Sequence, residues 1–397
     1  MAVTNALETA AQIPLIHVGA RPSAELCWHA PAQAQALVSE ALSRRSHPLL
    51  PHVTWLIDQL SHSWLARRAN PYLDEIRHVA AAIGRPGAYF LNIIYEWACS
   101  TSVAADRGSD GACMIRVLDW GLSGIGRHVV VARHETPHGP FYNATWPGYA
   151  GVLTGMAPGR FSAAINQAPR VPALGNRVLD EIITRLRVVF SHGTLPASHL
   201  LRRAFEEAAD FEGAVKILSD ERIDLAMPAI FTIAGTEPEE CCVIEALGTL
   251  RRVHRSENAK GGVLGVANQW LSSDLEGAPR NEAITTGPPM TPAANNAIRE
   301  RMVGALQASD FAGAADLEEP VLNSMTVIVV IANARRGEMV VEALDPPAGA
   351  IIPRVVARRE IRHAQEDTYS PPLPTIASAS REGALRSASG ATPGPLA

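Results

Sequence analysis

The chain of 397 residues is 47% hydrophobic and 19% charged, with a formal net charge of −5. Such a length can bury an ample core in one large domain or two ordinary ones. The charge balance supplies no basic field that would hold a polyanion, which argues against nucleic acid as a partner. The five cysteines are odd in number and lack the paired short spacings of a zinc site or a secreted disulfide framework, so we expect no metal.

Targeting and cofactor signals are also missing from the sequence. No segment pairs a basic region with the apolar stretch of a signal peptide, and none is an apolar run of membrane-spanning length. The glycines of "GLSGIG" do not fit the dinucleotide-binding spacing, and a strand-like run follows them, so this stretch is predicted to be a turn. We therefore expect a soluble cytoplasmic protein without a cofactor.

The first part of the chain is predicted to be helical. Between residues 49 and 64, apolar residues recur at intervals of three and four. The following run, "NPYLDEIRHVAAAIG", offers Asn70 as an N-cap, Pro71 at the first helical position and Gly84 as the end. We predict that residues 1–98 form a helical N-terminal segment whose apolar face packs on the rest of the protein, while a transient contact of that face with lipid is left open.

Strand-like runs begin at Cys99. The segments "CSTSVAAD", "ACMIRVLDW", "RHVVVARHE" and "RFSAAIN" are short, and turns rich in Gly, Asp and Pro separate them. Helical segments follow, with starts at Pro196 and Asp210, and then four more strand patterns from "PAIFTIAG" to "GGVLGVANQW".

A helical pair around residues 293–317 leads into the last two strand-like runs, "MTVIVVIANA" and "EMVVEAL". This alternation of strand runs and helices predicts an α+β domain over residues 99–369, with two antiparallel sheets packed between helical layers. Residues 370–397 are rich in Pro, Ser, Gly and Ala and are predicted to be disordered.

Cys99 is a candidate nucleophile because it opens the first strand and its neighbours are small and hydroxylated. Arg116 and Asp119 are unusual charged residues within the next apolar strand, and an antiparallel hairpin would return them beside the cysteine. Two other interpretations stay open. A free cysteine often serves as a small buried hydrophobe, and the charged pair would also suit a buried salt bridge that fixes the hairpin.

Cleavage between Ala98 and Cys99 would complete a catalytic unit. The thiol of an N-terminal cysteine can act as the nucleophile and its own α-amino group as the base, because that amine titrates near pH 8. Asp119 would then hold the ammonium form. Arg116 would orient that carboxylate and lower the pKa of the thiol through its positive charge.

The run "NPYLDEIRHVAAAIGRPGAYFLNIIYEWACSTSVAAD", followed by "MIRVLDWG", resembles the junction of the acid ceramidase and N-acylethanolamine acid amidase group. In that group a helical segment precedes a self-released catalytic cysteine, and the wider kin are choloylglycine hydrolases and penicillin acyltransferases. The resemblance implies a four-layer αββα sandwich of the N-terminal nucleophile hydrolases. It also implies catalytic roles for Cys99, Arg116 and Asp119, with Asp106 ending the first strand.

Two later segments extend the resemblance. The run "WPGYAGVLTGMAPGRFSAAINQAP" puts Asn166 where these enzymes carry a polar active-site residue. In "GVANQWLSSDLEGAPR", Asn268 matches the asparagine of the oxyanion hole and Arg280 the arginine that follows it. An amide N–H aimed at a developing oxyanion is worth roughly 3 to 4 kcal/mol. A turn asparagine at 268 and a surface arginine at 280 remain the alternatives.

Other positions bear on the substrate. Trp120 and Tyr149 are candidates to line an acyl pocket, although aromatic residues at strand ends also serve as ordinary core. The sequence reads Cys-Ser-Thr-Ser where the group usually reads Cys-Thr-Ser, and Gln167 replaces an acidic residue common in lipid amidases. The resemblance therefore implies the chemistry but not the substrate.

Together these features predict an autoprocessing hydrolase that cleaves the C–N bond of an N-acyl amide through a Cys99 thioester. N-acylethanolamine-like, ceramide-like and acyl-amino-acid-like substrates all present that bond. Self-cleavage would leave an α/β heterodimer, with further oligomerisation left open. The alternatives are an acyltransferase of the penicillin acyltransferase kind, in which an amine takes the acyl group, and a non-catalytic binding or scaffold protein on the same fold.

Overall fold

The structure is a computed structural model that describes ten stretches of the chain. They are residues 10–43, 50–93, 98–106, 111–122, 124–169, 195–258, 262–278, 286–306, 311–347 and 349–366. The chain divides into two compact units, Met1–His363 and Ala364–Ala397. Only the first three residues of the second unit are described. The predicted disorder of residues 370–397 therefore lies outside the described residues, and so does Arg280.

Seven described strands form the first sheet, sheet A. Their order is β1 (Ala11–Gln12), β15 (Arg354–Arg362), β14 (Glu338–Asp345), β13 (Thr326–Asn333), β4 (Ala112–Asp119), β3 (Ala98–Ala105) and β12 (Leu264–Val266). Neighbours run antiparallel, apart from β1, which is parallel to β15. Every residue of β4 is buried, because this strand lies between β3 and β13 and is covered on both faces.

Eight described strands form the second sheet, sheet B. Their order is β11 (Leu250–Arg255), β10 (Cys241–Leu247), β9 (Ala229–Ala234), β8 (Phe161–Gln167), β7 (Thr154–Ala157), β6 (Phe141–Thr145), β5 (Val130–His134) and β2 (Leu15–Val18). Strands β3 and β4 of sheet A face β8 and β9 of sheet B, and the main apolar core fills the space between the sheets. The predicted runs from Cys99 onward are all strands, whereas β6, β7 and β15 were not predicted.

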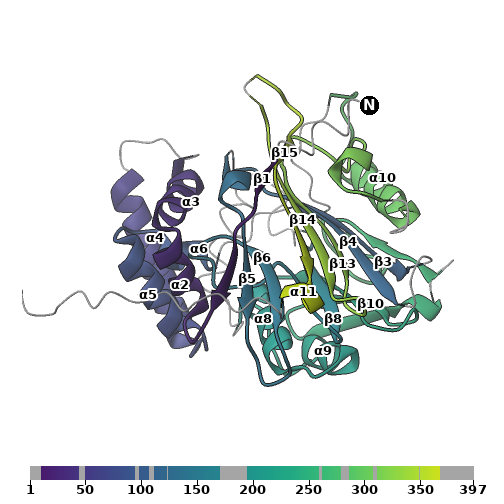
Figure 1. Ribbon diagram of the computed structural model, residues 1–397, viewed down its shortest axis with the longest axis horizontal. Helices are drawn as coiled ribbons and strands as arrows, with labels where there is room; N and C mark the ends of the chain where they lie inside the picture. The colour runs from purple at the N-terminus through teal and green to yellow at the C-terminus, as the bar shows by residue number, and fades with distance from the viewer. Residues whose placement is uncertain are drawn as a thin grey trace, which may run out of the picture. The chain divides into compact units, whose positions relative to one another are not determined.

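Helices cover the outer faces of both sheets. They are α2 (Pro22–His29), α3 (Pro31–Ser43), α4 (Leu50–Arg67), α5 (Leu73–Ile83), α6 (Ala88–Leu91), α8 (Ala197–Glu207), α9 (Phe211–Leu218) and α10 (Pro292–Ala305). A further short helix, α11 (His363–Glu366), follows β15 in the chain. Short 3₁₀ turns are η1 (Ile125–His128), η2 (Ser256–Asn258) and η5 (Ala314–Asp316). Figure 1 shows the N-terminal helices on one side of the sheets and α10 on the other.

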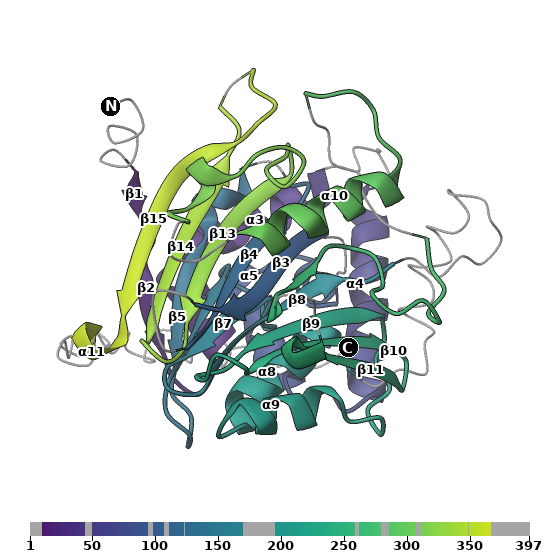
Figure 2. The ribbon, with the colours of Figure 1, turned by 90° about the vertical axis from the view of Figure 1, so that its right-hand side faces the viewer.

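Helices α8 and α9 pack on β8, β9 and β10 of sheet B, while α10 packs on β3 and β12 of sheet A, as Figure 2 shows. The predicted four-layer αββα arrangement of an α+β protein is confirmed. Of the described helices, none is both long and apolar enough to cross a membrane.

Two helix termini lie where the sequence predicts them. Gly84 ends α5 in the left-handed conformation, with φ of 69°, and Asp210 caps α9 by accepting from the backbone N–H of Gly213 at 2.8 Å. The predicted start of α5 is wrong. Asn70 Oδ1 accepts from the backbone N–H of Tyr72 at 3.0 Å and forms a turn, so that the helix begins only at Leu73.

The segment ahead of Cys99 is more than a helical bundle. Its β1 pairs with β15 in sheet A, and its β2 pairs with β5 in sheet B, so the segment adds one edge strand to each sheet. Strand β3 already begins at Ala98, which pairs with Asp119. These pairings make the segments before and after residue 98 parts of one folded unit. The predicted boundary at residue 98 therefore stays a prediction about cleavage of the chain and not about separate domains.

Candidate active site

Cys99 lies near the start of β3, with its side chain fully buried. In the β3–β4 pairing, Cys99 is opposite Leu118 and Thr101 is opposite Arg116. Because side chains alternate along a strand, Cys99, Thr101 and Arg116 share one face, and contacts to β8 show that this face is turned toward sheet B. The hairpin thus returns Arg116 beside the cysteine, as predicted.

Arg116 is fully buried and organises the polar groups around the thiol. Its Nη2 lies 2.8 Å from Cys99 Sγ and donates to Ile165 O at 2.8 Å. Its Nη1 donates to Thr101 Oγ1 at 3.1 Å and to Asn166 Oδ1 at 2.7 Å. These partners are neutral oxygens and a sulfur, and no carboxylate among the described residues accepts from this guanidinium. Its positive charge is therefore directed at the thiol.

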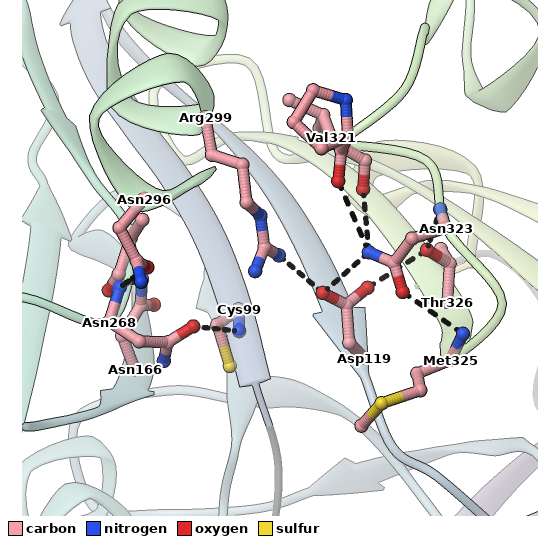
Figure 3. Close-up of polar contacts among 12 residues, drawn as sticks. Cys99, Asp119, Asn166, Asn268, Asn296, Arg299, Val321, Asn323, Met325 and Thr326 are labelled. Carbon is pink, nitrogen blue, oxygen red and sulfur yellow. Dashed lines mark hydrogen bonds and ion pairs between the residues drawn. The ribbon is translucent and has the colours of Figure 1, made fainter. Parts of the chain in front are cut away.

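The predicted pairing of Arg116 with Asp119 is wrong. The two residues lie an odd number of positions apart in one strand, so their side chains point to opposite faces of sheet A. Asp119 instead forms a fully buried ion pair with Arg299 of α10. It also accepts from Asn323 Nδ2 at 3.0 Å and from Thr326 Oγ1 at 2.8 Å, as Figure 3 shows.

Asn268 lies just beyond β12 and is fully buried beside Cys99. Its Oδ1 accepts from the backbone N–H of Cys99 at 2.9 Å (Figure 3), and its Nδ2 donates to Gln167 O at 2.7 Å. One Nδ2 proton is thereby used, and the second has no acceptor among the described residues. Asn268 is thus a direct partner of Cys99 and not only a residue that ends a strand.

Asn166 connects the two sheets at this point. Its Oδ1 accepts from Thr101 Oγ1 at 2.6 Å, in addition to the bond from Arg116, and its Nδ2 donates to Ala267 O at 3.0 Å. The side chain therefore lies between Arg116 and the strand end that carries Asn268. The sequence-predicted residues Cys99, Arg116, Asn166 and Asn268 come together in one hydrogen-bonded cluster.

The thiol is held in its protonated form in the intact chain. Burial raises the pKa of Cys99, and the negative charge of Asp119 adds to this rise, while the charge and hydrogen bond of Arg116 act in the opposite direction. The predicted lowering effect of Arg116 is present, but desolvation outweighs it. The Cys99 Sγ lies 3.7 Å from Ile165 O, in keeping with a thiol that donates a proton to a carbonyl.

Trp120 and Tyr149 form a buried aromatic cluster with Trp146. The rings of Trp120 and Trp146 meet edge to face with centroids 5.1 Å apart, and those of Trp120 and Tyr149 with centroids 6.4 Å apart. Burial also raises the pKa of the Tyr149 hydroxyl. A role for these residues in lining an acyl pocket stays a prediction.

The sequence analysis predicted a helix at α10 but missed its contacts with the site. Its residues Asn296 and Arg299 are fully buried, and they contact Asn268 and Asp119 respectively. The available signal was weak, because these polar residues lie on the buried face of a helix whose apolar periodicity is indistinct. Within the described residues, no group of three His, Cys, Asp or Glu side chains is placed to hold a metal ion.

No protein-family model matches the chain. The N-acylethanolamine-hydrolyzing acid amidase of Caenorhabditis elegans is 27% identical over 252 residues, covering 59% of this chain and 64% of that protein. Human acid ceramidase is 24% identical over 208 residues, covering 48% of this chain and 50% of that protein. The matches therefore span less than two thirds of these relatives.

Among solved structures, the Caenorhabditis elegans acid amidase ortholog matches with a TM-score of 0.41 and 18% identity, over 59% of this chain and 93% of that one. The sequence matches fall on the same group that the segments around Cys99 resemble. The chain is thus similar in sequence to N-acylethanolamine-hydrolyzing acid amidases and acid ceramidases.

Proposed function

We propose that this protein is an autoprocessing amide hydrolase that cleaves N-acyl amides with Cys99 as its nucleophile. One observation carries the proposal: two buried side chains hold the two reactive groups of Cys99. Arg116 lies against the sulfur at 2.8 Å, and Asn268 accepts from the backbone nitrogen at 2.9 Å. The substrate class is inferred from the relatives, whose names refer to the hydrolysis of N-acylethanolamines and to ceramides.

The first reaction is proposed at the peptide bond of the cysteine itself. Cys99 Sγ attacks the carbonyl carbon of Ala98, and the C–N bond breaks as the Cys99 nitrogen takes up the thiol proton. The acyl group of Ala98 is then joined to sulfur as a thioester. Water hydrolyses this thioester to an Ala98 carboxylate and the free thiol of an N-terminal Cys99. Because Cys99 is fully buried in the intact chain, this neighbouring bond is the first within its reach.

Turnover would use the groups that this cleavage releases. The new α-amine takes the thiol proton, and the thiolate attacks the substrate carbonyl. The resulting ammonium returns the proton to the leaving amine as the C–N bond breaks. Water then attacks the thioester with the same amine as base, which releases the fatty acid or other acyl product. The positive charge of Arg116 stabilises the thiolate in both steps.

Asn268 and Asp119 would assist from opposite sides of the strand. Asn268 Oδ1 already accepts from the nitrogen that becomes the amine, so it would orient the lone pair of that base. The second Nδ2 proton of Asn268 is the donor we assign to the developing oxyanion. Asp119 contacts Arg299 and not the Cys99 nitrogen, so its influence on the ammonium form would act through its charge over a longer distance.

The two fragments are expected to remain associated after cleavage. The segment ahead of Cys99 supplies an edge strand to each sheet, and its Glu75 forms a buried ion pair with Arg202 of α8 at 2.9 Å. These contacts involve only residues away from the cleaved bond. We therefore infer an α/β heterodimer as the active form.

The test compares Cys99→Ala with Cys113→Ala. Cys113 is also a buried cysteine, and it lies on the neighbouring strand β4. Intact mass of the purified wild type should show two fragments that meet between Ala98 and Cys99. Cys99→Ala should remain one chain and lose turnover of a panel of N-acyl amides, whereas Cys113→Ala should behave like wild type.

The same assay separates the alternative functions. The two products are measured when a competing amine is added to the N-acyl amide. More of the new amide than of the free acid would favour an acyltransferase. A wild-type chain that stays whole and fails to react with thiol-directed acyl probes would rule out the enzyme and leave a binding protein. Retained amidase activity in Cys99→Ala would remove Cys99 from the mechanism.

A further inference from the structure

Helix α10 contacts Asn268, which in turn contacts Cys99. Asn296 Oδ1 accepts from the backbone N–H of Asn268 at 2.8 Å (Figure 3), and both asparagines are fully buried. The Nδ2 of Asn296 donates to Pro292 O at 2.8 Å in the first turn of the same helix. This second bond fixes which end of the Asn296 amide faces Asn268. The amide therefore presents its oxygen, not its nitrogen, to the site.

A close approach of α10 to β12 makes this contact possible. A Cβ placed on Gly265 would lie 2.7 Å from Glu300 O and 3.1 Å from Gly304 Cα, closer than such atoms pack. Glycine at position 265 thus lets the helix backbone rest directly on the strand that leads into Asn268. The short side chain of Asn296 can then span the remaining gap.

The loop that follows Asn268 is anchored at further points. Gln269 Nε2 donates to Glu300 Oε2 at 2.7 Å, and the backbone N–H groups of Leu271 and Ser272 donate to the fully buried Glu245 of β10. Those anchors act on the residues after Asn268. Among the described residues, Asn296 is the side chain that accepts from the backbone N–H of Asn268 itself.

We propose that Asn296 is a positioning residue for the reaction at Cys99. By fixing the backbone of Asn268, it sets the Asn268 amide so that Oδ1 meets the Cys99 nitrogen and the second Nδ2 proton faces the oxyanion. The contacts run in sequence from Asn296 to Asn268 to Cys99. This inference rests on the proposed function, and it adds a residue that touches neither the substrate nor the reacting atoms.

Asn296→Leu tests the contact, because leucine has nearly the same size but no acceptor. Self-cleavage and kcat should fall about 10- to 100-fold, the order that a small misplacement of a reacting group costs, while KM changes little. The matched control is Asn295→Leu, which alters the adjacent buried asparagine of α10 that has no hydrogen bond to Asn268. That control should keep wild-type kcat.

Asn296→Asp supplies a second readout. When protonated, its carboxyl group has the shape of the amide, accepts from Asn268 and donates to Pro292 O, whereas the carboxylate cannot donate. Burial raises the pKa of such a carboxyl, so the activity of this variant relative to wild type should be highest at low pH and fall as pH rises. The activity is compared with that of wild type at each pH, because burial also raises the pKa of Glu300, which lies on α10 and accepts from Gln269, to about 7.

Hydrogen exchange of the Asn268 backbone amide separates the two proposals. It should quicken in Asn296→Leu and not in Asn295→Leu, whether or not the protein has activity. A wild-type protein without self-cleavage or turnover would overturn the proposed function. The exchange rates would still show whether Asn296 fixes the backbone of Asn268. Wild-type kcat and exchange in Asn296→Leu, or an equal loss in Asn295→Leu, would overturn the positioning role.

Discussion

Two buried arginines, Arg116 and Arg202, have opposite electrostatic surroundings. Arg202 of α8 makes ion pairs with Glu75 at 2.9 Å and with Glu206 at 2.7 Å, and its guanidinium lies over the ring of Tyr72. Arg116 of β4 meets neutral oxygens and the sulfur of Cys99. Carboxylates of the protein compensate the charge of Arg202, whereas the charge of Arg116 faces a thiol that becomes negative only in the proposed reaction.

Under the proposed function, this difference distinguishes an arginine that stabilises the fold, Arg202, from one that serves the reaction, Arg116. A buried charge that is paired with carboxylates joins two parts of a fold, here α5 in the segment ahead of Cys99 and α8 beyond it. A buried charge without a carboxylate partner is costly to fold, and it is a frequent mark of a site that stabilises an anion. Removing each arginine should therefore affect a different property.

The largest effect is expected on activity when Arg116 is replaced. Arg116→Met removes the charge beside the thiolate and should slow self-cleavage and turnover by roughly 100-fold or more, the order seen when one preorganised donor is removed. Intact mass over time and kcat on an N-acyl amide would measure this. Arg116→Lys keeps the charge but loses the fork of donors, so it should recover only part of the rate. Wild-type rates in Arg116→Met would show that this charge serves the fold alone.

The effect on stability should be largest at Arg202. Arg202→Met leaves Glu75 buried without its cation, which should lower the free energy of unfolding by about 3 to 5 kcal/mol. Urea unfolding of a chain held intact by Cys99→Ala gives this value without interference from cleavage. The double variant Glu75→Leu, Arg202→Met removes both charges and should regain much of the loss. Equal stability of the single variant and the parent would show that the pair does not join these helices.

A smaller, pH-dependent effect is expected beside Arg202. Burial lowers the pKa of His199 to about 3, and the charge of Arg202 acts in the same direction. Asn70 Nδ2 lies 2.9 Å from His199 Nδ1, which suits a neutral ring that accepts. The unfolded chain binds a proton near its usual pKa of about 6.5 while the folded chain does not. Stability should therefore be lost as pH falls from there toward 3.

The measurement is the free energy of unfolding against pH in wild type and in His199→Gln. The variant should show a shallower loss between about pH 6.5 and 4, because its side chain does not titrate. An unchanged slope would mean that His199 is not the group that takes up the proton.

Much of the fold followed from the sequence because the relevant signals are local. Short β-rich runs between turns marked most strands from Cys99 onward, and Gly84 and Asp210 marked a helix end and a helix start. The orientation of Arg116 and Asp119 could also have been predicted. Their odd spacing in one strand requires opposite faces, and the assumption that they pair overlooked this rule.

The sequence by itself determined the position of Cys99 at the start of a strand, the return of Arg116 beside it, and the likeness to the acid amidase group. Only the tertiary structure decided that Asp119 pairs with Arg299, that Asn268 rests on Asn296, and that β1 and β2 join different sheets. Asp119 and Arg299 lie 180 residues apart in the chain. Contacts of that kind depend on how the layers stack, because helix and strand periodicity specify which face is buried but not which residue covers it.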